Sequence, residues 1–337
     1  MLYKKVYIDS FGYELAPNVV SSDDIEKRLE PLYKALHFQK GQLEALTGIR
    51  ERRFWDPGFP MYEGAIKAGQ KALDSSLVSP EDIGILIYAG VCRDNLEPAT
   101  ACAVSHGLGL GPETQIYDVS NACLGVLNGM IQVANAIELG QIKAGLVVSC
   151  ESARQIMEFT MDRLLENKDM DHFKKTVATL TGGSGAVAVL MTEASISNTG
   201  HRLFGGVVRS ATRHHKLCRW GPDTGVPASG LHVMQTDSVG VLQHGVVLGI
   251  ETYYAFKKKL SWPDDKPDKV ICHQVGATHI PEERDFTTFK HLGNIGTVSL
   301  PITAAIAEER EFLVKNDLVG FFGIGSGLNC LMLGIRW

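Results

Sequence analysis

The chain has 337 residues, of which 45% are hydrophobic and 21% charged, and its formal net charge is -5 at pH 7. This profile predicts a globular protein of two domains or two halves, with a core that needs no disulfides or metals. The absence of a basic stripe argues against nucleic acid as a partner. No apolar run reaches membrane-spanning length, so no membrane insertion is expected.

The seven cysteines are scattered without framework spacing, which predicts reduced thiols. The first ten residues, MLYKKVYIDS, form a strand pattern and lack the hydrophobic stretch and cleavage site of a signal peptide. Together these features predict a cytoplasmic protein.

Short apolar runs typical of buried strands alternate with amphipathic helical patterns along the chain. Ser79 and Pro80 also form a helix-start signature. The alternation predicts an α/β protein with largely parallel sheets. The predicted strands cover residues 5–13, 83–91, 114–120, 144–152, 185–191, 269–275 and 318–326, and the clearest helical patterns cover residues 21–36 and 60–76.

The order of elements repeats within the chain. Residues 83–151 and residues 268–327 both run from a strand through a polar or small-residue turn and a helix into a buried strand. We interpret this as an ancient duplication, with halves at 1–195 and 196–337. The segment from about 195 to 235 is rich in Gly, Thr, Arg and His, and is interpreted as the connection between the halves plus surface excursions.

Cys123 lies where the strand pattern of "QIYDVSNACLGVLNGM" changes into a helix pattern. A helix N-terminus favours negative charge and lowers the pKa of a thiol placed there, so Cys123 is a candidate nucleophile. Small flanking residues would let a substrate carbonyl approach. The alternative is a small buried hydrophobe, which is the usual role of a free cysteine.

A nucleophilic cysteine needs a base or proton partner. His273 follows a buried strand, at the kind of position where α/β folds carry chemistry, although it could equally be a satisfied core histidine. Asn294 lies between two glycines just before a helix pattern. It is either a turn residue or a side-chain amide that points at a developing oxyanion.

Other motifs carry weaker signals. The stretches TGGSGAVAVL and GIGSGLNC lack the context of a dinucleotide site or a P-loop, but their glycines permit close backbone approach, and the backbone near Ser326 could complete an oxyanion hole. The cluster RHHKLC has no second ligand pair, so no metal is expected. The stretch GIRERRFW is either a solvated face or a grip for a phosphorylated, adenine-bearing ligand.

Taken together, the motifs NACLG, HQV, GNIG…SLP, GGSGAVAVL and GIGSGLN occur in the order found in the thiolase superfamily, specifically its ketoacyl synthase III branch. The chain resembles that family over nearly its full length. The stretches VCRDNLEPAT and RSAT…KLCR are most similar to the group that condenses two fatty acyl-CoAs head to head. The resemblance implies a five-layered αβαβα fold built from two duplicated halves, and a homodimer.

The resemblance also implies residue roles. Cys123 would be the acyl-accepting nucleophile, and His273 with Asn294 would stabilise the second thioester as its enolate. The backbone N–H groups of Cys123 and Ser326 would form the oxyanion hole. Glu97 would serve as base in the partner subunit's active site. The arginine cluster implies that Arg50, and with it Trp55, contacts coenzyme A. No cofactor is expected beyond the acyl-CoA substrates.

Three other functions stay open at this point. The family's usual HQAN is HQVG here, so a β-ketoacyl-[acyl carrier protein] synthase III that decarboxylates a malonyl carrier is an alternative, with acyl carrier protein as a partner. A cysteine thioester hydrolase would need only Cys123 and His273. A non-catalytic acyl-binding scaffold is the remaining alternative. Acyl chain length depends on packing that the sequence does not show.

Overall fold

The computed structural model describes residues 1–222, 232–274 and 280–337. Within them, nine strands form one mixed sheet in the order β11-β12-β13-β8-β1-β7-β6-β4-β5. These strands are β1 (Val6–Leu15), β4 (Ile83–Ala89), β5 (Gln115–Val119), β6 (Ala144–Glu151), β7 (Gly185–Glu193), β8 (His201–Ser210), β11 (Lys269–Cys272), β12 (Leu318–Gly325) and β13 (Asn329–Arg336).

The strand order is symmetric about its centre. Reading outward, β1-β7-β6-β4 on one side corresponds to β8-β13-β12-β11 on the other. On each side the first two pairings are antiparallel and the third is parallel. The two sides meet where Tyr7 pairs with Arg202 and Ile8 with His201. This repeated topology is what a duplication of one half would produce.

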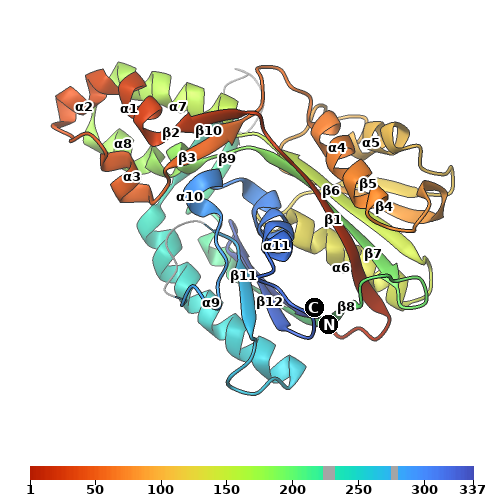
Figure 1. The fold of residues 1–337 in the computed structure, drawn as a ribbon. Coiled ribbons are helices and arrows are strands. Elements are labelled where there is room, and N and C mark those ends of the chain that lie inside the picture. The colour runs from red at the N-terminus through yellow and green to blue at the C-terminus, as the bar shows by residue number, and fades with distance from the viewer. Residues whose placement is uncertain (223–231, 275–279) are drawn as a thin grey trace.

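Helices cover both outer faces and fill the space between the two halves of the sheet (Figure 1). Helix α4 (Met61–Asp74) and α5 (Thr100–Leu108) pack on one outer face, and α9 (Ser238–Leu260) packs on the other. Between the half-sheets lie α6 (Gly125–Glu138) and α11 (Ser299–Glu309). The result is the five-layered αβαβα arrangement expected from the sequence.

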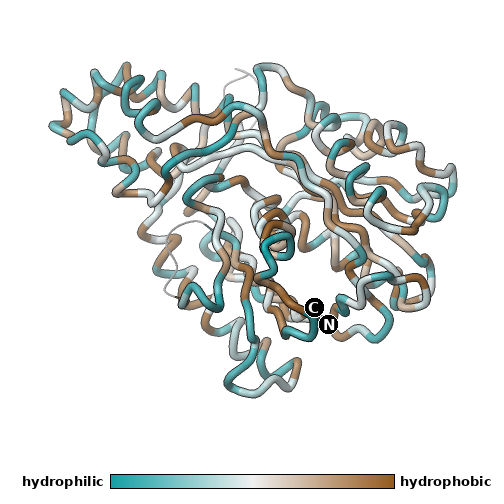
Figure 2. Tube along the Cα trace, viewed as in Figure 1, coloured by the Kyte–Doolittle hydropathy of each residue, from teal (hydrophilic) through white to brown (hydrophobic). Residues whose placement is uncertain are grey.

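Strand sequences explain the layering, because alternate side chains of a strand face opposite sides of a sheet. In β7, Val187 and Val189 face the central helices, whereas Ala186 and Ala188 face α4. Both sides are buried, so residues 185–191 of the strand are all apolar or glycine. The hydropathy-coloured trace shows such apolar segments along the central strands, with polar residues in the outlying helices (Figure 2).

A group of short helices projects from one end of the sheet and packs around its own apolar cluster. Its elements are α1 (Ser22–Arg28), α2 (Glu30–Leu36), α3 (Gln42–Thr47), α7 (Arg154–Asn167) and α8 (Met170–Thr176), with two antiparallel strand pairs, β2 (Asn18–Ser21) with β3 (Glu51–Phe54) and β9 (Cys218–Pro222) with β10 (His232–Thr236). The short helix α10 (Phe289–Leu292) lies between this group and the central layer, in contact with β3.

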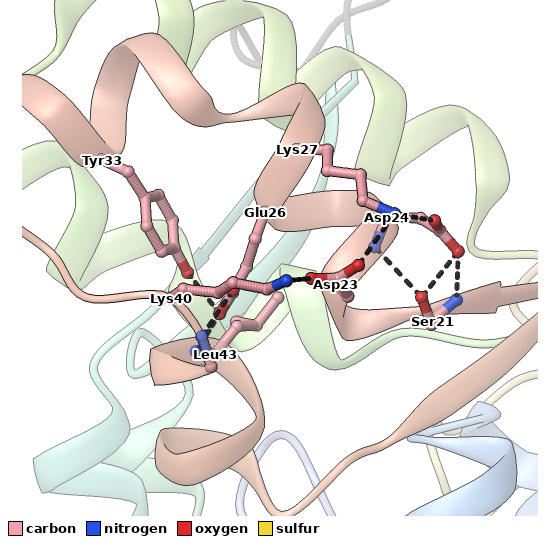
Figure 3. Close-up of polar contacts among 9 residues, drawn as sticks. Ser21, Asp23, Asp24, Glu26, Lys27, Tyr33, Lys40 and Leu43 are labelled. Atoms are coloured by element: carbon pink, nitrogen blue, oxygen red, sulfur yellow. Dashed lines mark hydrogen bonds and ion pairs between the residues drawn. The ribbon is translucent and has the colours of Figure 1, made fainter.

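Polar contacts, some exposed and some buried, hold the first of these helices in place (Figure 3). Ser21 and Asp24 form a reciprocal capping box at the start of α1. The buried Glu26 carboxylate accepts hydrogen bonds from the backbone N–H of Leu43 at 2.7 Å and from the hydroxyl of Tyr33 at 3.0 Å. These bonds join three helices that are too short to be stable alone.

Three sequence-based expectations need correction. The sheet is not largely parallel, because five of its eight strand pairings are antiparallel and three are parallel. Strands joined by a short turn, such as β12 and β13, pair antiparallel because no crossover helix separates them. The segment from about 195 to 235 is more than a connection, because β8 is an internal strand of the sheet; residues 223–231 lie outside the described residues. The helix-start signature at Ser79 and Pro80 produces only one 3-10 turn, Pro80–Asp82, before β4 begins. The buried run that follows is held as a strand by β5 and β6, and this tertiary pairing overrides the local signal.

Candidate active site

Cys123 lies in the turn that joins β5 to α6, as the sequence pattern predicts. The preceding Ala122 has a left-handed backbone with φ of 44°, which is strained for a residue with a Cβ. The backbone N–H of Val126, in the first turn of α6, donates a 2.7 Å hydrogen bond to Oγ1 of Thr297 in the second half of the chain. A cross-half contact therefore fixes the helix end that carries Cys123.

A cavity of about 480 Å³ opens at this turn. Cys123, Asn294 and Ser326 all line it, although they are far apart in the sequence. Its remaining wall comes from the first residues of α7, the turn before β7, and the paired strands β9 and β10, which contribute Arg219 and Trp220 among others. Three of the predicted site residues, one from the first half and two from the second, are thus brought together.

Asn294 is oriented by its neighbours. Its backbone N–H donates to the carbonyl of Thr181 at 2.8 Å, and its own carbonyl accepts from Gly183 at 2.9 Å. Its side-chain Oδ1 accepts from the backbone N–H of Gly296 at 3.1 Å. The side-chain NH₂ has no hydrogen-bond partner among the described residues, so it is the group available to a ligand in the cavity.

Glycines let the backbone segments around Asn294 and Cys123 pack closely against each other, as the sequence predicts. A Cβ at Gly183 would lie 2.2 Å from the carbonyl oxygen of Leu292, and one at Gly293 would lie 2.6 Å from that of Thr181. At the other wall, a Cβ at Gly325 would lie 3.5 Å from the backbone nitrogen of Cys123. The terminal glycine-rich turn therefore packs directly against the candidate nucleophile.

His273 directly follows β11, and its backbone N–H donates to the carbonyl of Phe322 at 2.8 Å. Its side chain is buried, and neither ring nitrogen has a hydrogen-bond partner among the described residues. Burial lowers the pKa of His273 to about 4, so the ring is neutral at neutral pH. His273 is not among the residues that line the cavity.

The next residue explains how His273 is held. The side-chain oxygen of Gln274 accepts from the backbone N–H groups of Thr288 and Phe289, and its NH₂ donates to the carbonyl of Phe286. Gln274 thus fixes the strand end to the segment that enters α10. The Val and Gly of the HQVG motif lie outside the described residues.

The electrostatics of Cys123 differ from the sequence-based expectation. Burial, the nearby Cys218 thiol and the negative charge of Glu151 raise the pKa of Cys123 to about 12, whereas a helix N-terminus was expected to lower it. Cys123 precedes the helix by two residues, and Thr297 already occupies one of the free N–H groups there. The resting thiol is therefore neutral.

Glu151 is a cavity residue that the sequence analysis missed, because it reads as the end of an apolar strand. Its side chain is 4% exposed and lines the cavity beside Cys123. The two carboxylate oxygens accept from the backbone N–H groups of Val91 at 2.8 Å and Cys92 at 3.1 Å. Burial raises the pKa of Glu151, and these hydrogen bonds act against that rise.

Glu97 lies apart from this cavity. It is exposed on the loop between β4 and α5, beside Leu96, which is 93% exposed. It does not line the cavity of its own chain. The single chain therefore brings Cys123, Asn294 and Ser326 together in one cavity, whereas neither His273 nor Glu97 lines it.

The arginine-rich stretch separates into exposed and core residues. Arg50 is exposed, as a ligand-contacting residue requires. Arg52 is fully buried, donates to Ser22 and Leu180, and burial lowers its pKa to about 10. Trp55 is 2% exposed, stacks on Phe59 and donates its ring N–H to the carbonyl of Glu151. Trp55 presents almost no surface to a ligand and has the surroundings of a core residue.

All seven cysteines are free thiols. Among the described residues, no group of three or more His, Cys, Asp or Glu side chains is placed to hold a metal ion. Of the helices in the described ranges, none is both long and apolar enough to span a bilayer.

Comparison with known proteins agrees with this geometry. Residues 117–211 match the family described as 3-oxoacyl-[acyl-carrier-protein (ACP)] synthase III, and residues 260–337 match its C-terminal region. The chain is 50% identical to an acyl-CoA:acyl-CoA alkyltransferase of Shewanella oneidensis and 36% identical to one of Xanthomonas campestris, each over 100% of both chains. The crystal structure of Xanthomonas campestris OleA with bound lauric acid and lauroyl-CoA superposes with a TM-score of 0.93, at 36% identity and over 100% of both chains. The chain therefore belongs to the OleA-like condensing enzymes of the thiolase superfamily.

Proposed function

We propose that this enzyme joins two fatty acyl-CoAs through an acyl-Cys123 intermediate to give a β-ketoacyl product. The observation that carries the proposal is the shared cavity, which is lined by Cys123 from one half of the chain and by Asn294, whose side-chain NH₂ has no partner among the described residues, from the other. The full-length alkyltransferase relatives support two acyl-CoAs as the substrates.

In the first step, the sulfur of Cys123 loses its proton as it attacks the carbonyl carbon of one acyl-CoA. The carbon–sulfur bond to coenzyme A breaks, and the departing thiolate takes a proton. Because the pKa of Cys123 is raised, the thiolate forms together with the attack and is not present beforehand. The backbone N–H groups of Cys123 and Ser326 are proposed to bind the oxyanion.

In the second step, a base removes an α-proton from the second acyl-CoA. The resulting carbanion attacks the acyl-Cys123 carbonyl, and the sulfur of Cys123 leaves and regains a proton. The enolate oxygen needs strong hydrogen bonds, because a carboxylate is a weak base for such a proton. We assign these bonds to the NH₂ of Asn294 and a ring N–H of His273. His273 lies outside the cavity lining, but its neutral ring is buried and both ring nitrogens lack a partner among the described residues, so a donor is available to a bound thioester.

We assign the base to Glu97, supplied by a second copy of the chain. Glu97 is exposed and outside the cavity of its own chain, and the exposed Leu96 beside it offers an apolar surface to a neighbouring subunit. The active unit is then a homodimer. Arg50, which is exposed, remains the proposed contact to the phosphates of coenzyme A.

The second candidate is a synthase III reaction, which the family matches over residues 117–211 and 260–337 favour. In that reaction, loss of carbon dioxide from a malonyl carrier generates the carbanion, and no base is needed. Acyl carrier protein would then be a partner. The role of Glu97 therefore separates the two candidates.

Acylation of Cys123 tests the first step. After incubation with lauroyl-CoA, intact-protein mass spectrometry should show the wild-type protein with one added acyl group, and peptide mapping should place it on Cys123. Cys123→Ala should gain none, whereas Cys102→Ala, which changes an exposed thiol, should behave as wild type. Product analysis should find a β-keto compound with carbons from both donors. Free lauric acid as the sole product would instead make the enzyme a hydrolase.

Replacement of the proposed base tests the second step. Glu97→Gln should keep acylation of Cys123 but lose about 100-fold or more in condensation of two lauroyl-CoAs, because the amide cannot accept the α-proton. Glu113→Gln, at another exposed carboxylate, should have no effect. Wild-type condensation by Glu97→Gln would refute the assignment.

Mixed subunits show which copy supplies the base. A heterodimer of Glu97→Gln and Cys123→Ala chains contains one site with an intact thiol faced by an intact Glu97 from the other chain. If Glu97 acts across the dimer, the purified mixed dimer should have about half of the activity of a wild-type dimer, because one of its two sites is intact. If it acts within its own chain, the mixture should stay inactive.

The lowered pKa of His273 predicts an acid-sensitive stability. His273 is neutral in the folded state down to about pH 4, whereas the unfolded chain binds a proton near pH 6.5. The stability that this group contributes is present above pH 6.5 and is lost as the pH falls from there toward 4. Between pH 7.5 and 5, the wild type should lose on the order of 2 kcal/mol more than His273→Asn in urea unfolding. Equal losses would show that the ring is not buried in its neutral form.

A further inference from the structure

Glu151 lines the cavity beside Cys123 but has no role in the proposed reaction. It is a buried carboxylate with no Lys, Arg or His within ion-pair distance among the described residues. Burial of an unpaired charge is costly, so a carboxylate kept there needs a reason. Its charge also acts against ionisation of Cys123, so Glu151 does not activate the nucleophile.

The hydrogen bonds of Glu151 indicate what it does. Its two oxygens bind the backbone N–H groups of Val91 and Cys92, which begin the loop of residues 90–99. The carbonyl of Cys92 is also tied to the hydroxyl of Tyr88 at 2.7 Å, and its thiol contacts the carbonyl of Ser152 at 3.4 Å. The start of the loop is therefore fastened to the end of β6, at the cavity wall.

Two further carboxylates hold the rest of this loop. Asp94 accepts from the backbone N–H groups of Met61 and Tyr62 at the start of α4. Asp118 accepts from those of Thr100 and Ala101 at the start of α5, where the loop ends. Between these anchors, Leu96 and Glu97 are exposed. Of the three anchors, Glu151 alone lines the cavity with Cys123.

We propose that Glu151 is a positioning residue that sets the loop of residues 90–99, and through it Glu97, in the place from which Glu97 serves the Cys123 of the second copy. The proposal rests on the proposed function, in which Glu97 is the base. A carboxylate suits the task because it offers two equivalent acceptor oxygens to two adjacent N–H groups. Glutamine offers one acceptor and would turn its NH₂ toward the second N–H.

The test separates the two steps of the reaction in Glu151→Gln. We expect acylation of Cys123 by lauroyl-CoA within about twofold of wild type, and condensation reduced about tenfold or more. In the double variant with Glu97→Gln, condensation should fall no further than in Glu97→Gln alone, because both changes remove the same base from its place. Glu26→Gln is the matched control, because Glu26 is also a buried carboxylate that accepts from two backbone N–H groups, those of Gly41 and Leu43, but lies away from this loop. We expect any loss there to be equal for acylation and condensation.

Three results would overturn the proposal. The first is wild-type condensation by Glu151→Gln while Glu97→Gln is inactive. Glu97 would then still be the base, but Glu151 would not position it. The second is an additive loss in the double variant. The third is a lowered midpoint in the pH profile of Cys123 alkylation with condensation unchanged, which would make Glu151 a modulator of the thiol. If Glu97→Gln itself condenses normally, Glu97 is not the base, and that result refutes the proposed function independently of the role of Glu151.

If Glu151→Gln does not fold, as judged by circular dichroism, Glu151→Asp provides the same test. It keeps the charge but is shorter by one methylene and cannot span both N–H groups at hydrogen-bond distance. The proposal predicts normal acylation and reduced condensation for this variant too, and equal effects on both steps would contradict it.

Discussion

The site depends on the contact between the two halves of the chain. The first turn of α6 donates the N–H of Val126 to Thr297, and the glycine-rich end of β12 packs against the backbone of Cys123. Neither half contains a complete site: the thiol comes from the first and the amide of Asn294 from the second. The shared core between α6 and α11, which buries apolar side chains from both half-sheets, holds this contact in place.

Burial sets the chemistry as much as residue identity does. It raises the pKa of Cys123 and lowers that of His273, so at rest both the thiol and the imidazole are neutral. A thiolate–imidazolium ion pair, as in many cysteine enzymes, would keep the cysteine permanently ionised and reactive toward any electrophile. A neutral thiol reacts only when a bound substrate draws the charge onto an oxygen that the site can stabilise. This suits an enzyme that must hold an acyl group for a second substrate and avoid losing it to water.

Much of the fold could be predicted from the sequence, because buried strands and amphipathic helices have strong periodic patterns. The strands β4, β6 and β7 lie close to their predicted ranges. β8 was missed because its glycine- and arginine-rich sequence resembles a loop, and only pairing with β13 and β1 makes it a strand. The long helix α9 was also missed, because its exposed face carries Val239, Leu242 and Val246 and has no clear amphipathic period.

The candidate site could be predicted in part. Cys123, Asn294 and Ser326 were found because ordered motifs carry them, and glycines mark the close approaches around them. The burial of Trp55 and Arg52 was not visible, since an aromatic and basic stretch looks the same on a surface as in a core. Glu151 was missed for the opposite reason. A single carboxylate at the end of an apolar strand has no local signal, and its meaning comes from two N–H groups some 60 positions away.

The most direct measurement of the central claim is a crystal structure of the wild-type enzyme trapped after exposure to a single acyl-CoA. The account predicts electron density that continues from the sulfur of residue 123 into an acyl chain, with the thioester beside the amide of Asn294 and the turn at Ser326. An acyl group attached to a different side chain, or one whose carbonyl lies beyond reach of the residues donated by the second half, would contradict it.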